Sequence, residues 1–108
     1  MSKLKMCFIS YPNKEKASIA AEYIVKNNIA ACVKILEGIT SFYIFEGKFE
    51  KDEEVYLIAK TIEENVDSLQ IYLKDNHPYK VYEFLSVDAD SINSDYFKWI
   101  KENTSRKI

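Results

Sequence analysis

The apolar and polar residues of this 108-residue chain alternate in patterns that predict strands and helices in turn. Residues 5–11 are rich in strand-forming side chains and stop at Pro12, which predicts a first strand. Asn13 is placed to cap a helix that continues to about Asn28. The apolar positions of this helix form a narrow stripe of mainly small residues, which lets it lie close on a sheet: Ala17, Ala20, Ala21 and Ile24.

Two long runs of β-forming residues, 29–45 and 48–61, follow this helix. The pair Glu46-Gly47 between them is typical of a tight hairpin turn. Gly38 indicates a bulge or bend inside the first run. Side chains in the inner half of the second run alternate with a period of two, Val55, Leu57 and Ala59 against Tyr56, Ile58 and Lys60.

Three more elements are expected after the hairpin. Apolar residues at helical spacing predict a second helix: Ile62, Val66, Leu69 and Leu73. This helix ends by His77, because Pro78 disfavours helical geometry in the residue before it. Residues 81–87 predict a strand, and Ser91 or Asn93 begins a short final helix. Three residues of the final helix share one face: Tyr96, Trp99 and Ile100.

The order β-α-β-β-α-β plus a C-terminal helix predicts an α+β fold of the ferredoxin-like type. In this split βαβ sandwich, two helices cover one face of a four-stranded antiparallel sheet. We expect a single domain over residues 1–108, with an ordered core at 6–102 and a tail at 103–108.

The central hairpin is too long for such a domain, because each strand has about fifteen residues against roughly five or six in an average strand. At about 3.3 Å per residue, each strand would span roughly 50 Å. The flanking strands cannot cover that length, so the aromatic run 42–45 would present an unpaired apolar edge. We therefore expect copies of the chain to associate through the 30–61 hairpin. The alternative is two shorter strands separated by a kinked loop at Glu37-Gly38.

Composition and charge exclude several classes of partner. The net charge is −2, with acids and bases mixed along the chain, so no basic stripe is available for nucleic acid. Cys7 and Cys32 lie in apolar runs, which indicates buried thiols of a reducing compartment and not a disulfide. The apolar run 6–9 is too short for a signal-peptide core or a membrane span. We expect a cytoplasmic protein without membrane association.

Five short motifs occur in order: Ala-Ala-Cys-Val at 30–33, Thr-Ser-Phe-Tyr-Ile-Phe-Glu-Gly-Lys at 40–48, Lys-Thr at 60–61, His-Pro-Tyr at 77–79 and Tyr-Phe-Lys-Trp at 96–99. Together they resemble the CutA (divalent-cation tolerance) family over essentially residues 6–102. The resemblance implies a ferredoxin-like subunit in a tightly packed homotrimer, similar in architecture to the PII signal-transduction proteins. It also implies a link to tolerance of copper and other divalent cations, with no established enzymatic activity. We expect no required cofactor.

Two residues are candidate metal ligands. His77 is the only histidine, and a neutral imidazole suits copper or zinc; alternatively, it is a helix-terminal residue that interacts with the helix dipole. Cys32 matches the family's Ala-Ala-Cys cysteine and as a thiolate would take a soft metal, whereas as a thiol it is small core filling. Relatives proposed to bind copper carry a cysteine where Ile9 stands and a second histidine where Asn76 stands.

A second candidate site is a ligand-binding cleft. Lys60 and Glu83 each interrupt an apolar strand, and a Lys–Glu pair would explain both, since a charge in an apolar setting needs a partner. The other hypothesis is that they line an inter-subunit cleft for a small anion or a metal complex. Its residues would be Lys60, His77, Tyr79, Glu83, Tyr96 and Trp99.

The leading functional hypothesis is a non-enzymatic trimeric binding or signalling protein linked to divalent metal-ion homeostasis, with copper or another divalent metal as candidate ligand. Alternatives are a PII-like sensor of a small anion or metabolite, and a trimer that scaffolds an unidentified protein partner. An acylphosphatase-like hydrolase shares the fold plan but needs an arginine in a loop after the first strand. The one arginine here, Arg106, lies in the tail.

Overall fold

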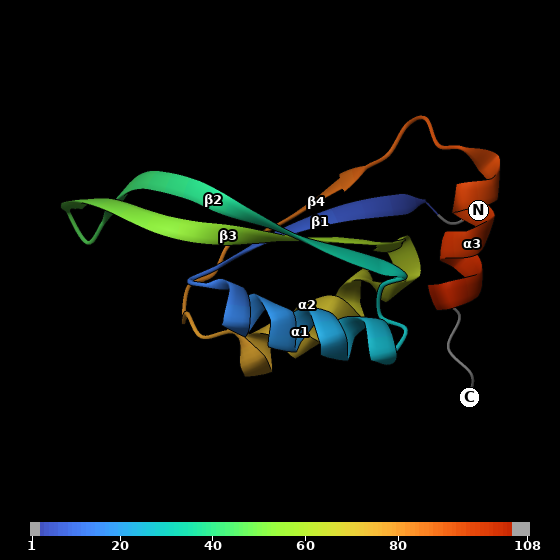
Figure 1. The fold of residues 1–108 in the computed structure, drawn as a ribbon, viewed down its shortest axis with the longest axis horizontal. Helices are drawn as coiled ribbons and strands as arrows, with labels where there is room; N and C mark the ends of the chain where they lie inside the picture. The colour runs from blue at the N-terminus through green and yellow to red at the C-terminus, as the bar shows by residue number, and fades with distance from the viewer. Residues whose placement is uncertain (1–2, 105–108) are drawn as a thin grey trace.

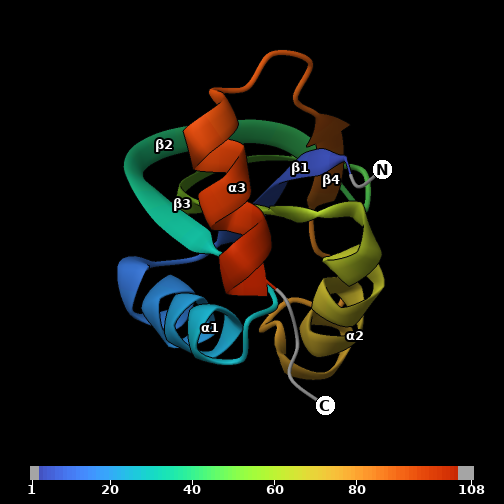
Figure 2. The same ribbon diagram turned by 90° about the vertical axis from the view of Figure 1, so that its right-hand side faces the viewer.

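The computed structural model describes residues 3–104. Its elements are β1 (Leu4–Tyr11), α1 (Lys14–Lys26), β2 (Cys32–Phe45), β3 (Lys48–Ile62), a short 3-10 helix η1 (Glu63–Asn65), α2 (Val66–Asn76), β4 (Phe84–Asp88) and α3 (Ser94–Thr104). Helices α1 and α2 cover one face of the sheet, and the β2–β3 hairpin projects beyond them (Figure 1). Helix α3 lies at the end of the sheet opposite the hairpin turn (Figures 1 and 2).

The four strands form an antiparallel sheet in the order β2-β3-β1-β4. Strand β1 pairs with the inner half of β3, from Leu4 opposite Ile62 to Tyr11 opposite Val55. Strand β4 pairs only with residues 5–9 of β1. The α+β, ferredoxin-like prediction is therefore confirmed, as is the element order on which it was based.

Local sequence explains where the helices begin and end. The Asn13 side chain accepts a hydrogen bond from the Lys16 amide at 2.8 Å, which caps α1 as predicted. At the other end Asn28 takes a left-handed conformation with φ 58°, a geometry that asparagine tolerates. The stripe of small residues packs against the sheet in the main core, which contains Cys7, Ile9, Tyr11, Ala17, Ala20, Ile24, Leu57, Ala59, Leu69 and Leu73.

Helix α3 builds a second, smaller core at the end of the sheet. Ile100 is fully buried and packs with Leu4 and Ala31, with Met6, Ile62 and Tyr96 around them. The amide nitrogen of the buried Asn65 donates to three backbone carbonyls, those of Asn28, Ile29 and Thr104, at 3.0–3.3 Å. One side chain thus joins the α1–β2 connection, η1 and the last turn of α3.

The hairpin is one continuous ribbon, as predicted, and not two short strands with a kinked loop. A bulge interrupts the pairing only between Leu36 and Ile39, where Gly38 has a φ of 76°. Glu46 and Gly47 both have positive φ, 50° and 78°, the conformation of a tight hairpin turn. Beyond Val55, no third strand of the described chain pairs with β3, so residues 39–54 form a two-stranded ribbon.

The structure differs from the predicted elements at several boundaries. Strand β2 begins at Cys32 and not at Ile29. Strand β4 begins at Phe84 and not at Val81, because its pairing with β1 stops at Ile9. Ile62 ends β3 opposite Leu4 instead of starting the second helix. Residues 103 and 104, which were expected in the tail, belong to helix α3, which continues through the buried Thr104; the rest of the predicted tail, residues 105–108, lies outside the described part of the chain.

Candidate functional site

His77 lies directly after α2, where it joins the helix to the end of β1. Its Nε2 is 2.8 Å from the Ser10 carbonyl oxygen, and its Nδ1 accepts a hydrogen bond from the Tyr79 amide at 3.0 Å. These partners assign the ring proton to Nε2. The ring also packs against Tyr11 and Tyr82, with centroids 4.4 and 4.9 Å apart. His77 therefore holds the start of the 78–83 segment in place.

The surroundings of His77 favour the neutral imidazole. Burial lowers its pKa below the ordinary value, and the bond to Ser10 and the charge of Glu54 oppose this only in part. Both ring nitrogens already have partners within the subunit, so a bound metal would have to replace one of these hydrogen bonds. Metal binding by the His77 imidazole stays a prediction, and it requires the loss of the hydrogen bond to Ser10 or to Tyr79.

Cys32 and His77 lie at different ends of the sheet. Cys32 is the first residue of β2, is half-buried, and stands opposite Lys60, which itself pairs with Met6. His77 contacts Ser10, four residues further along β1, a separation of about 13 Å along the strand. Within residues 3–104, no three His, Cys, Asp or Glu side chains are grouped closely enough to hold one metal ion.

The six residues predicted for the cleft also divide into two groups. Lys60 lies over the Tyr96 ring, with its Nζ 5.5 Å from the centroid, and Tyr96 stacks on Trp99 at 5.9 Å. At the other end, Glu83 accepts a hydrogen bond from the Tyr56 hydroxyl at 2.6 Å. Lys60 and Glu83 therefore have different partners and do not form the ion pair considered from the sequence.

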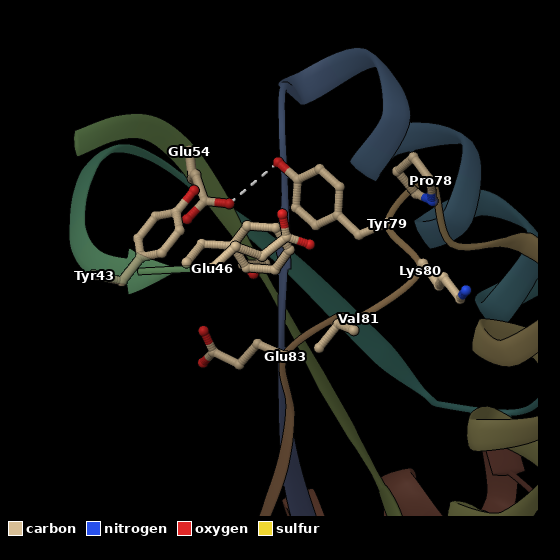
Figure 3. A pocket seen from close by; sticks show the side chains of 10 residues that line it. Tyr43, Glu46, Glu54, Pro78, Tyr79, Lys80, Val81 and Glu83 are labelled. Carbon is tan, nitrogen blue, oxygen red and sulfur yellow. Dashed lines mark hydrogen bonds between the residues drawn. The ribbon is translucent and has the colours of Figure 1, made fainter. Parts of the chain in front are cut away.

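Two of the six predicted cleft residues, Tyr79 and Glu83, line a cavity of about 730 Å³ between the outer hairpin and the 78–83 segment, whereas His77 is not part of its lining. Figure 3 shows the rings of Tyr43 and Tyr79 on opposite sides of the Glu54 carboxylate, with Glu46 and Glu83 facing the same space. Its lining residues are Ser10, Tyr43, Phe45, Glu46, Glu54, Pro78, Tyr79, Lys80, Val81 and Glu83. We call it the hairpin cavity.

The sequence identified Tyr79 and Glu83 but not the hairpin half of this cavity. Tyr43, Glu46 and Glu54 sit about thirty residues away in the chain, and only the tertiary fold brings them opposite 78–83. The sequence did indicate that the hairpin extends past β1. It did not indicate that the aromatic and acidic residues of the hairpin lie opposite the 78–83 segment after α2.

The hairpin cavity is electronegative. The Tyr79 hydroxyl donates to Glu54 at 3.3 Å, and burial together with that carboxylate raises the pKa of Tyr79. The hydrogen bond to Glu83 raises the pKa of Tyr56 to about 12. Both tyrosines therefore remain neutral donors at physiological pH. Three carboxylates against a single lysine give a potential that repels a small anion.

No helix within residues 3–104 has the length and apolar character needed to cross a membrane.

Comparison with known proteins gives consistent results in sequence and in structure. The family profile described as CutA1 divalent ion tolerance protein matches residues 5–103. The chain is 37% identical over 97 residues to a protein CutA homolog of Xenopus laevis, and 35% identical over 99 residues to the divalent-cation tolerance protein CutA of Pyrococcus horikoshii. These alignments cover 90% and 92% of this chain.

Coverage of the relatives differs, since the chain spans 64% of the Xenopus protein but 96% of the Pyrococcus one. Among solved structures, CutA1 from Oryza sativa superposes with a TM-score of 0.92 at 36% identity, covering 97% of this chain and 96% of that one. The divalent cation tolerance protein from Thermus thermophilus superposes with a TM-score of 0.91 at 33% identity, covering 94% and 99%.

Proposed function

Because the chain belongs to the CutA1 divalent ion tolerance family, we propose that it is a non-enzymatic homotrimeric binding protein of the cytoplasm that contributes to tolerance of copper or another divalent metal. The link to divalent-cation tolerance comes from the family. The homotrimer, the metal and the absence of catalysis are the parts that need testing.

The observation that carries self-association is the free ribbon at residues 39–54. Ile44 and Phe49 stand opposite each other and are each 67% exposed, and the adjacent Phe42 is exposed as well. Within the described residues, no strand pairs with the edge of β2 that faces away from β3. In the same part of the chain, the edge of β3 that faces β1 is unpaired from Lys48 to Glu54. Unpaired strand edges beside exposed apolar side chains favour pairing with another chain. A closed trimer would cover the ribbon of each subunit with its neighbours.

A second apolar surface supports the same assembly. Leu36, Leu85 and Val87 are exposed on strands of the sheet. Leu85 pairs with Phe8 and Val87 with Met6, on the face opposite the one that packs on α1 and α2. Such a face, continuous with the ribbon, is typical of an interface between copies of a chain.

The metal hypothesis rests on His77 and Cys32 as ligands. Imidazole nitrogen and thiolate sulfur both suit copper. Because the two side chains lie about 13 Å apart along the sheet, they would have to bind in combination with residues from neighbouring subunits. A small-anion sensor has less support, since carboxylates line the hairpin cavity.

Sedimentation velocity tests the assembly. We expect a species of about 38 kDa, three times the 12.6 kDa of the subunit, at micromolar concentration. A species of subunit mass would contradict the proposal.

Calorimetric titration of copper and of zinc tests the metal. The parent should give saturable heat that His77→Ala abolishes, while circular dichroism shows that the variant is folded. Flat traces for parent and variant alike would remove the metal from the proposal and leave the assembly standing.

A further inference from the structure

We propose that a cavity between α1 and α2 binds a small aromatic carboxylate, a ligand with one ring and one negatively charged group. Its lining residues are Tyr11, Lys16, Ile19, Ala20, Tyr72, Asn76 and Pro78. We call it the interhelical cavity. None of these residues lies on the 39–54 ribbon or on the exposed sheet face, and α1 and α2 cover the other face of the sheet (Figures 1 and 2). The site therefore goes beyond the proposed function, because it requires neither a metal nor a second subunit.

The hydroxyl of Tyr11 is the observation that points to a ligand. Tyr11 is only 2% exposed, yet its hydroxyl has no hydrogen-bond partner within residues 3–104. In the same part of the chain, no side-chain nitrogen or oxygen that is sealed from solvent lacks a partner. The Tyr11 hydroxyl therefore reaches the interhelical cavity, which Tyr11 lines. A phenol donor held there without an acceptor from the protein is available to an acceptor atom of a ligand.

The charge of the cavity is positive. Lys16 is the one charged residue of its lining, and no carboxylate takes part. The residues one helical turn away along α1, Asn13, Ile19 and Ala20, are uncharged, and Lys16 forms no ion pair within residues 3–104. The cavity thus offers an ammonium group and a neutral hydroxyl donor, and a carboxylate has acceptor oxygens for both.

The apolar part of the lining suits an aromatic ring. The ring of Tyr72 and the side chain of Ile19 come from the two facing helices. Tyr72 stacks on Tyr23 with centroids 4.5 Å apart, and Tyr11 packs on His77 at 4.4 Å. Both lining rings are therefore held in place before any ligand arrives, which lowers the entropic cost of binding.

The volume of the interhelical cavity limits the size of the ligand. It is about 190 Å³, whereas drug-sized ligands occupy sites of roughly 300–1,000 Å³. A cavity of about 150 Å³ is sufficient for a molecule of benzene. The interhelical cavity therefore has room for one aromatic ring with a carboxylate group, but not for a nucleotide.

Titration of the isotope-labelled, purified protein with benzoate, followed by two-dimensional NMR, tests the site. We expect saturable shifts of the amide signals of the lining residues, with a Kd of about 0.1–1 mM, since so small a ligand makes few contacts. Benzyl alcohol has the ring without the charge, and acetate has the charge without the ring. Each should bind at least about tenfold more weakly than benzoate.

Two variants remove the proposed polar contacts. Tyr11→Phe deletes the hydroxyl but keeps the ring, and should weaken benzoate binding about tenfold. Lys16→Gln deletes the charge, and should weaken it about fivefold. Tyr23→Phe and Lys74→Gln are the matched controls, because they make the same chemical changes on α1 and α2 outside the cavity. Each control should change the affinity less than about twofold.

Four results would overturn the proposal. One is the absence of saturable shifts with benzoate, and another is equal binding of benzyl alcohol, which would mean that the carboxylate is not recognised. The third is unchanged affinity in both Tyr11→Phe and Lys16→Gln, and the fourth is equal weakening by the two controls. The NMR spectrum of each variant shows whether it is folded, and the exposed Lys16 provides a test that leaves the core unchanged.

Discussion

At the residue scale, two polar side chains, the half-buried His77 and the buried Asn65, each join segments that lie far apart in the chain. His77 joins α2, β1 and the 78–83 segment through both ring nitrogens. Asn65 joins the α1–β2 connection to the end of α3 through a single amide group. Neither role follows from residue type alone, since each depends on carbonyls that lie far away in the chain.

We predict that His77 makes the stability of the protein depend on pH. Burial lowers the pKa of His77 in the folded state below the value of about 6.5 in an unfolded chain. As the pH falls through 6.5, the unfolded chain therefore binds a proton that the folded chain does not, and the free energy of unfolding decreases. Urea unfolding at pH 7.5 and 5.5, at fixed protein concentration, measures this change. His77→Gln should show a smaller decrease, and an equal decrease would contradict the prediction.

Asn65→Ala should lower the free energy of unfolding by about 1–3 kcal/mol, because the carbonyls of Asn28 and Thr104 lose the side-chain donor that Asn65 supplies, while the Ile29 carbonyl keeps the Thr61 hydroxyl. Asn103→Ala is the matched control, since the Asn103 amide bonds only an exposed carbonyl one helical turn away. Thermal and urea unfolding of both variants would test this. A loss for Asn65→Ala no larger than that for Asn103→Ala would show that the three bonds are not stabilising.

At the element scale, the hairpin depends on two glycines with positive φ. Gly38 sits in the bulge and Gly47 in the turn, and neither would bring a Cβ within 4 Å of other atoms. The requirement for glycine there is therefore one of backbone conformation and not of space. The bulge and the turn together set which side chains of the ribbon stand opposite one another.

Gly47→Ala should therefore cost about 1 kcal/mol per subunit, the strain of a left-handed backbone in a residue with a Cβ. Lys48→Ala, at the first position of β3, is a control with ordinary strand geometry and should have little effect. Comparison of their thermal unfolding would show whether the turn contributes. Equal melting temperatures would mean that the ribbon is not coupled to the stability of the fold.

At the scale of the whole molecule, the subunit leaves apolar surface uncovered in two connected places, the outer ribbon and the sheet face away from α1 and α2. The folded core does not need either surface, since the buried residues lie against α1, α2 and α3. Changes on the ribbon should therefore affect assembly and not the fold of the subunit.

Phe49→Asp should shift the protein from about 38 kDa toward the 12.6 kDa subunit in sedimentation velocity, because it places a charge in the proposed interface. Ile19→Asp is the matched control: Ile19 is 61% exposed on α1, and a charge there should leave the mass unchanged. Circular dichroism would verify that both variants are folded. An unchanged mass for Phe49→Asp would contradict assembly through the ribbon.

The sequence by itself determined the order of the elements and the excess length of the hairpin. These features are local: the period of two in 55–60, the cap at Asn13 and the turn at Glu46-Gly47 act through neighbouring residues. Only the tertiary structure decided which side chains share a site. The packing of α3 places Tyr96 beside Lys60, and the path of 78–83 brings Glu83 to Tyr56 and Tyr79 to Glu54. Such contacts depend on how distant segments pack, which no local pattern encodes.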